Sequence, residues 1–400
     1  MKTNHLYLLF ICFFSTFNSV GQEQKIGLVL SGGGATGLCH VGVLKALEEN
    51  NIPIDYIAGT SAGAMIASMY ACGYSPEQIE TYVLSDEFQL MTSGGLRADQ
   101  HFLLHETEPN GSMISFSFSK DSILRKSLPT NFNSSSYLDF EMMKNMGLVS
   151  ASKNNDFDSL FIPFRCVASD IAKKESVVFK DGHLNAAVRA SMTFPFFIKP
   201  IRIDGVLLFD GGLYNNFPAD VIYTAFNPDF IIGSNVSYNA APPDENSLIS
   251  QLTNMLVAKT NFSLPCEQGI IIKPDTDVAT FSFVDVEQAI EDGYKATLAI
   301  IDSIKEQIPR YVTKEELTVK RHAFRSTIKP LNVTSISSIT DSTELRYTRL
   351  SLIKSKKPES LTIEQLEKRY FRLYATPQVD FIFPVIENNE DGSHNLSLKV

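Results

Sequence analysis

Ser61 lies at the centre of a five-residue pattern, Gly59-Thr60-Ser61-Ala62-Gly63, that could support nucleophilic chemistry. A short apolar run that begins at Ile54 precedes it, and small and apolar residues of helical character follow it. A G-x-S-x-G pattern between a strand and a helix is typical of a nucleophile elbow, because glycines leave room beside a serine on a strained turn. We therefore predict that Ser61 is a nucleophile and that Ala62 opens a helix whose free N–H groups favour an oxyanion.

A glycine-rich stretch, SGGGATG over residues 31–37, is the second candidate site element. It lies between a predicted strand over residues 25–30 and a predicted helix over residues 38–50. Such a turn directs several backbone N–H groups to one point, which suits an anion. The same residues also satisfy the dinucleotide pattern G-x-G-x-x-G, with Asp55 as the acid that would bind the ribose.

The position of Asp55 favours an oxyanion hole over a dinucleotide site. Asp55 begins the second predicted strand, whereas a ribose-binding carboxylate normally follows the end of that strand. The same strand ends at Ser61, and sequential parallel strands are usually neighbours, so the glycine loop is expected beside the serine. Retention of a nicotinamide or flavin would support the dinucleotide alternative. The predicted oxyanion hole consists of four residues: Gly32, Gly33, Gly34 and Ala62.

Asp210 is the predicted partner of Ser61. A short apolar strand, LLF over residues 207–209, ends at this acid, and Gly211 and Gly212 form the turn that follows. An acid at the carboxyl edge of a sheet lies where active sites of α/β proteins are found. An ordinary Asx turn is the structural alternative for a single D-G-G sequence.

The histidines argue against a Ser-His-Asp triad. In hydrolase order the histidine would follow the acid, and the histidines beyond Asp210 are His322 and His394, both in the C-terminal tail. His40, inside the helix after the glycine loop, and His183, in a D-G-H turn, are expected to be structural. The sequence therefore favours a Ser–Asp dyad in which the carboxylate is the base.

The motifs SGGGATG, GTSAG and DGG, in this order and at this spacing, resemble those of the patatin-like phospholipase family. DSLFIPFRCVASD over residues 158–170 and ASMTFP over 190–195 are similar to family segments around the site. The resemblance covers residues 24–310. It implies a three-layer α/β/α sandwich that hydrolyses acyl esters of membrane phospholipids or other lipids, as a phospholipase A or lysophospholipase, with no cofactor and no metal. The supporting glycines would be Gly37, Gly59, Gly63, Gly211 and Gly212.

One residue departs from this resemblance. Many family members carry Arg or Lys where this chain has Thr36. A cation at that position could hold the glycine loop or meet a lipid phosphate. Its absence leaves the headgroup preference open.

The N-terminal segment of the chain predicts export, and the net charge argues against a nucleic-acid partner. A net charge of −10 disfavours nucleic acid, which requires a basic surface. Lys2 and a short apolar core over residues 6–17 predict a signal peptide over residues 1–21, cleaved before Gln22. A membrane anchor is the alternative. We expect the mature protein in the periplasm, at the outer membrane or outside the cell.

A small α+β module is predicted at the C-terminus. Residues 311–329 are polar and charged and are interpreted as a linker. Residues 330–400 show a β-α-α-β-β order, with helices around Leu345 and Leu366 and a hairpin turn at Asp391-Gly392. This order resembles a POTRA (polypeptide-transport-associated) module, as in type V secreted patatin proteins, and implies an outer-membrane translocator as a partner. The alternative function is a secretion or surface-interaction protein with weak or vestigial esterase activity.

Three further predictions concern the body of the chain. Residues 286–308 are predicted to form one long amphipathic helix with Ile290, Leu298, Ile301 and Ile304 on its apolar side. Residues 78–156 are interpreted as an insertion near the site, with a strand over 114–118. The cysteines beyond the signal peptide lack a C-x-x-C spacing, which disfavours a metal or redox site.

Overall fold

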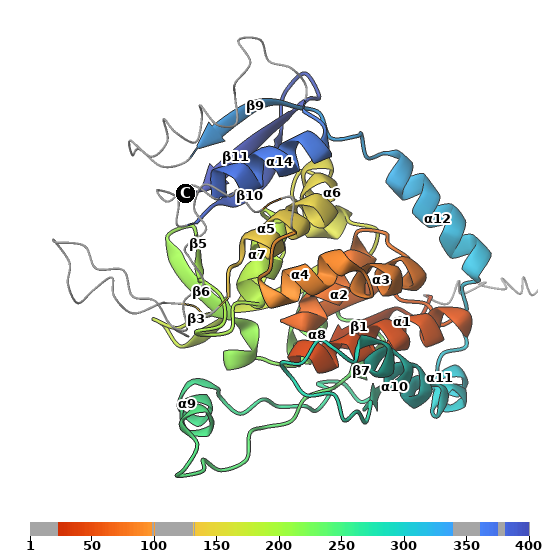
Figure 1. Ribbon diagram of the computed structural model, residues 1–400. Helices are drawn as coiled ribbons and strands as arrows, with labels where there is room; N and C mark the ends of the chain where they lie inside the picture. Colours follow the sequence, from red (N-terminus) through yellow and green to blue (C-terminus); the bar gives the residue numbers. More distant parts are fainter. Residues whose placement is uncertain are drawn as a thin grey trace, which may run out of the picture.

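The computed structural model describes residues 23–97, 100, 131, 133–338, 361–374 and 381–399 (Figure 1). Three of the predicted segments lie outside the described residues. They are the signal peptide over residues 1–21, the strand over residues 114–118 and the first C-terminal helix, around residue 345.

A twisted sheet of eight described strands forms the centre of the molecule. Its order is β5-β6-β3-β2-β1-β7-β8, and β4 pairs with β3 beside this path. The parallel strands are β1 (Ile26–Leu30), β2 (Tyr56–Thr60), β3 (Phe164–Asp170), β7 (Phe230–Ser234) and β8 (Gly269–Ile272). The antiparallel strands are β4 (Glu175–Phe179), β5 (Ile201–Ile203) and β6 (Val206–Asp210). Because β1 and β2 are parallel neighbours, the turns at their carboxyl ends lie side by side.

Helices cover both faces of this sheet, as the α/β expectation requires. Leu28 and Leu30 of β1 pack with the helices of one face, whereas Val29 between them packs with the helix of the other. The first face carries α1 (Cys39–Glu49), α2 (Ala62–Ala71), α7 (Leu184–Ser191) and α10 (Val286–Leu298). The second face carries α8 (Ala219–Phe226). This alternation follows from the two-residue period of side chains along a strand.

Shorter helices surround these layers (Figure 1). They are α3 (Pro76–Val83), α4 (Asp86–Ser93), α5 (Ser136–Met142), α6 (Leu148–Ser152), α9 (Leu248–Leu256) and α11 (Ile301–Gln307). The single helix predicted over residues 286–308 is wrong, because α10 ends at Leu298 and α11 begins at Ile301. The interruption turns Ile301 and Ile304 into the core and leaves Leu298 38% exposed.

The segment interpreted as a linker, residues 311–329, contains the helix α12 (Lys314–Ser326), which was not predicted from the sequence. Thr313 and Glu316 form a capping box at its start. Its contact with the sheet domain is both ionic and apolar. The guanidinium of Arg321 donates to both carboxylate oxygens of Glu48 on α1, with one N···O distance of 3.0 Å, and lies 5.1 Å from the ring centroid of Tyr70. Leu317 is buried, and the ring centroid of Phe324 lies 5.8 Å from that of Phe161.

A second, three-stranded sheet packs beside the first domain, with the order β10-β11-β9. Its elements are β9 (Val333–Ser338), α14 (Ile363–Tyr374), β10 (Phe383–Asn388) and β11 (His394–Lys399). The predicted hairpin between β10 and β11 is confirmed. The resemblance to a POTRA module stays a prediction.

The two sheets share one hydrophobic core. Phe140 of α5 packs against the rings of Tyr370 and Phe371 on α14, with centroid distances of 5.1 and 5.6 Å. The hydroxyl of Tyr370 donates to the backbone oxygens of Ser136 and Ile382, so it connects the two parts directly. The C-terminal part is therefore packed onto the sheet domain along α5.

Replacement of Arg321 by Ala is expected to lower the free energy of unfolding by roughly 3–5 kcal/mol, because Glu48 would remain buried without a partner. Urea denaturation followed by circular dichroism measures this change. Lys320→Ala is the matched control, because Lys320 is exposed on the same helix. An unchanged midpoint in Arg321→Ala would show that α12 is not held by this ion pair.

Candidate active site

Ser61 lies on the strained turn that the sequence predicts. Its backbone has φ 55° and ψ −125°, between the last residue of β2 and the first turn of α2. A Cβ on Gly59 would lie 2.5 Å from the Gly63 oxygen, and a Cβ on Gly63 would lie 2.4 Å from the Ser31 oxygen. The glycines of the pattern therefore allow the close packing that forces the serine outward.

Asp210 and Ser61 meet directly. The Ser61 hydroxyl donates to Asp210 Oδ2 at 2.7 Å, which is within the range for proton transfer to a general base. Asp210 ends β6, and its Oδ1 accepts from the N–H of Gly212 at 2.8 Å. A Cβ on Gly211 would lie 2.1 Å from the Val167 oxygen, so this turn requires glycine where β6 passes β3. The structure thus brings together the predicted nucleophile and acid.

Two residues that the sequence reasoning did not assign position this pair. The Ser191 hydroxyl accepts from the Ser61 N–H at 2.9 Å and donates to the Val167 oxygen at 2.5 Å. The N–H of Asp210 donates to the Thr193 oxygen at 2.8 Å. Both belong to the ASMTFP segment, whose resemblance to the family was the only signal in the sequence.

A buried ion pair fixes this same segment. Arg189 on α7 donates to Asp139 of α5 at 2.6 Å, and neither side chain is exposed to solvent. The guanidinium also donates to the Thr193 hydroxyl at 2.5 Å. Burial raises the pKa of Asp139, and the charge of Arg189 opposes that rise. The ion pair thus supports the segment between α7 and β5, in which the Thr193 oxygen accepts from the N–H of Asp210.

The oxyanion hole differs from the prediction at one residue. The N–H of Gly32 donates to the Asn216 oxygen at 3.0 Å, so it anchors the loop and is not directed at a substrate. Among the described residues, no acceptor is recorded for the N–H groups of Gly33, Gly34 and Ala62, which line the cavity beside Ser61. These three N–H groups are the donors that remain for an oxyanion.

Side chains hold the glycine loop from both sides. The Thr36 hydroxyl donates to the Gly33 oxygen at 2.9 Å. His40, which is fully buried, contacts the Ser31 oxygen through Nε2 and the Ser234 hydroxyl through Nδ1, both at 2.8 Å. Because a carbonyl only accepts, Nε2 carries the proton, and burial lowers the pKa of His40 to about 4. His40 is therefore a neutral structural residue, as predicted.

Asp55 lies away from the glycine loop. It precedes β2, at the amino edge of the sheet, and its carboxylate accepts from the N–H of Ile26 at 2.8 Å and pairs with Arg310. The carboxylate that a dinucleotide site would need is thus committed to a structural ion pair at the opposite edge. The dinucleotide interpretation loses the residue on which it depended.

A cavity of about 360 Å³ opens over Ser61 and Asp210. Most of the side chains that line it are apolar, and an aromatic group forms one wall. Phe281 packs against Phe194 and Phe197, with ring centroids 5.6 and 5.0 Å apart. Phe281 is 51% exposed, so this wall continues to the surface. The cavity is suited to an extended apolar chain whose polar end reaches the serine.

No helix among the described residues is long and apolar enough to cross a bilayer. The same residues contain no group of three or more His, Cys, Asp or Glu side chains that could hold a metal. Cys39, Cys72 and Cys166 are buried free thiols. In the part of the chain that the structure describes, no histidine contacts Ser61 or Asp210.

The family model of the patatin-like phospholipases matches residues 28–223, which contain the glycine loop, the serine elbow and the acid. The match supports the patatin-like phospholipase family for this part of the chain. In this patatin-like domain, Thr36 stands where many family members carry a cation. The hydrogen bond from its hydroxyl to Gly33 shows that a neutral side chain also holds the loop.

Relatives of the patatin-like domain include much longer proteins. Patatin-like phospholipase domain-containing protein 6 from Homo sapiens is 35% identical over 210 residues, which make up 52% of this chain and 13% of that protein. Lysophospholipase NTE1 from Phaeosphaeria nodorum is 26% identical over 340 residues, 77% of this chain and 20% of that protein. The chain therefore spans a fifth or less of the length of these relatives. The crystal structure of VipD from Legionella pneumophila matches with a TM-score of 0.39 and 14% identity, over 83% of this chain and 76% of that chain.

Asp210 is expected to give the patatin-like domain a distinctive pH dependence. Burial raises the pKa of Asp210 to about 6, although the hydrogen bonds from Ser61 and Gly212 oppose that rise. A base acts only when deprotonated, so kcat/KM for a soluble ester should fall about tenfold per pH unit below pH 6 and level off above it. Rates between pH 4.5 and 8, with circular dichroism as a folding control, measure this profile. A midpoint near pH 4 would contradict a buried carboxylate base.

Proposed function

We propose that this protein hydrolyses acyl esters of lipids, as a phospholipase A or lysophospholipase. The observation that carries this proposal is the 2.7 Å hydrogen bond from Ser61 to Asp210 at the base of an apolar cavity. A nucleophile–base pair needs this contact, and an acyl substrate needs an apolar site next to it.

The geometry supports a two-step mechanism. Asp210 Oδ2 accepts the proton as Ser61 Oγ attacks the ester carbonyl, and the N–H groups of Gly33, Gly34 and Ala62 stabilise the oxyanion. The tetrahedral intermediate expels the alcohol, which takes the proton from Asp210 and leaves an acyl-serine. A water molecule then gives a proton to Asp210 and attacks the acyl carbonyl. Ser61 leaves as the hydroxyl after that proton returns to it, and a fatty acid is released.

The surface around the cavity supports a lipid substrate. Tyr238, which also lines the cavity, is 85% exposed, and Leu248 and Met255 on α9 are 70% and 78% exposed. Exposed apolar side chains beside a catalytic cavity are suited to contact with an aggregated lipid. The names of the two relatives, a patatin-like phospholipase domain-containing protein and a lysophospholipase, support the same substrate class.

Ser61→Ala and Asp210→Asn are each expected to reduce fatty-acid release from phosphatidylcholine and lysophosphatidylcholine vesicles by roughly a thousandfold or more, because each removes one half of the dyad. Ser68→Ala is the matched control, since Ser68 is a buried serine of the same helix as Ala62 and its hydroxyl contacts Met65.

Release that persists in Ser61→Ala would remove the elbow from the mechanism. A parent protein that folds but releases no fatty acid from any lipid would favour the surface-interaction function.

Export and an outer-membrane translocator partner complete the proposal. Their support is the charge and apolar pattern of residues 1–21 and the order β9-α14-β10-β11, which is compatible with the resemblance of residues 330–400 to a POTRA module.

Protein expressed in a Gram-negative host is expected to appear in the cell envelope with Gln22 as its first residue, as N-terminal sequencing would show. Leu9→Arg, which interrupts the apolar core of the signal peptide, should keep the chain in the cytoplasm. An envelope protein that retains Met1 would support the membrane anchor instead.

A further inference from the structure

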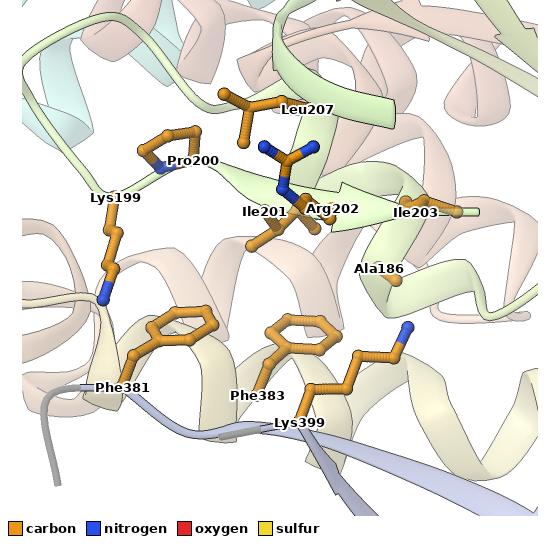
Figure 2. Close-up of a pocket in the computed structure, with 10 residues that line it drawn as sticks. All are labelled: Ala186, Lys199, Pro200, Ile201, Arg202, Ile203, Leu207, Phe381, Phe383 and Lys399. Carbon is orange, nitrogen blue, oxygen red and sulfur yellow. The ribbon is translucent and has the colours of Figure 1, made fainter. Parts of the chain in front are cut away.

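A second cavity, of about 380 Å³, lies between the edge strand β5 and the C-terminal sheet (Figure 2). It shares no lining residue with the cavity above Ser61. The segment over residues 194–203 separates the two: Phe197 and Ile198 line the catalytic cavity, and the residues that follow line the second one. Its lining residues are Ala186, Lys199, Pro200, Ile201, Arg202, Ile203, Leu207, Phe381, Phe383 and Lys399.

The base of this cavity is apolar and well packed. Phe383 is 2% exposed and belongs to a small core cluster with Ala186 and Ile201. Phe381 packs against the same cluster, and Figure 2 shows the two rings next to each other below β5. The Asn185 side chain donates to the Pro384 oxygen at 2.9 Å and holds β10 against α7. The cavity is therefore formed by two packed parts of the chain.

Two lysines, Lys199 and Lys399, flank this apolar base, whereas the guanidinium of Arg202 lies on the other side of β5 from the two rings (Figure 2). The ammonium of Lys199 lies 5.0 Å from the ring centroid of Phe381, and Lys399 lies at the other end of the ring pair (Figure 2). Arg202 donates to the Gly205 oxygen at 3.0 Å. None of these three side chains forms an ion pair with a carboxylate of the described residues. In a chain of net charge −10, this is a local concentration of cations that have no carboxylate partner within the described ranges.

We propose that this cavity binds an anionic single-chain amphiphile, namely a long-chain fatty acid. The alkyl chain would lie on the rings of Phe381 and Phe383, and the carboxylate would meet Lys199 or Lys399 at one end of the ring pair. A volume near the lower end of the roughly 300–1,000 Å³ typical of ligand sites suits one acyl chain. The proposed hydrolysis would release such a molecule, but the binding itself does not depend on that activity.

Isothermal titration with laurate tests the proposal on the full-length Ser61→Ala protein, in which turnover cannot interfere. The double variant Lys199→Gln/Lys399→Gln is expected to bind laurate up to roughly fivefold more weakly, because it removes the partly exposed lysine that the carboxylate meets at either end of the ring pair. Lys320→Gln, an exposed lysine of α12, should leave the affinity unchanged. Dodecanol has the same chain and no charge. Its affinity for the parent should therefore be no higher than the affinity of laurate for the double variant.

Equal laurate affinity in the parent and the double variant would overturn the proposal, since laurate would then occupy the catalytic cavity, which neither lysine lines. A diazirine-bearing fatty acid gives a second measurement. Photolabelling is expected on peptides that span residues 381–399, and label confined to peptides with Met65 or Met91 of the catalytic cavity would also overturn it.

The test also separates a free fatty acid from a lipid headgroup. Phosphatidylglycerol vesicles should bind the parent and the double variant equally if the site takes a free fatty acid. If the double variant loses vesicle binding but keeps its laurate affinity, the two lysines form a contact with a membrane surface and the proposal is wrong. Both outcomes are independent of ester turnover, so neither repeats the test of the Ser61–Asp210 dyad.

Discussion

The buried carboxylate of Asp210, hydrogen-bonded to Ser61, is the constraint on which the rest of the site depends. Burial makes this acid a stronger base than an exposed aspartate, and it also makes its ionised form costly. The protein offsets that cost with two donors, the Ser61 hydroxyl and the Gly212 N–H. The pairing of β6 with β3, in which Asp210 lies opposite Ala168, fixes the position of this carboxylate.

The glycine loop is fixed by a second set of contacts, which come from the end of β7. The N–H of Ser31 donates to the Ser234 oxygen, and the N–H of Val236 donates to the Ser31 hydroxyl. The Thr36 hydroxyl donates to a carbonyl oxygen within the loop, and the N–H of Gly32 donates to a carbonyl oxygen outside it. These hydrogen bonds involve the N–H groups of Ser31 and Gly32 and leave those of Gly33 and Gly34 without a recorded acceptor among the described residues. The N–H groups of Gly33 and Gly34 are thereby held in place before a substrate arrives, which is the condition for electrostatic stabilisation of a transition state.

The chemistry-bearing residues could be predicted from the sequence because each belongs to a short motif next to a recognisable strand. Ser61, Asp210 and the glycine loop are examples. The order of the parallel strands β1 and β2 brings the glycine loop beside Ser61, whereas Asp210 reaches the site on the antiparallel strand β6, through its pairing with β3. The role of Gly32 could not be predicted, because it depends on Asn216, far away in the chain. The helix α12 was missed because charged and polar residues dominate its sequence, and the buried ion pair between Arg321 and Glu48 is a contact with a distant part of the chain. Both failures concern long-range contacts that leave no local pattern.

The shared core between the two sheets has a consequence for how this chain could have arisen. The aromatic rings of Phe140, Tyr370 and Phe371 pack against one another, so the C-terminal sheet is not an independently folded domain joined only by a linker. Recombination can exchange modules that meet only through polar surfaces, whereas a module that completes its neighbour's core must change together with it. The C-terminal sheet and α5 are therefore expected to have co-adapted, and the two parts should unfold as one cooperative unit.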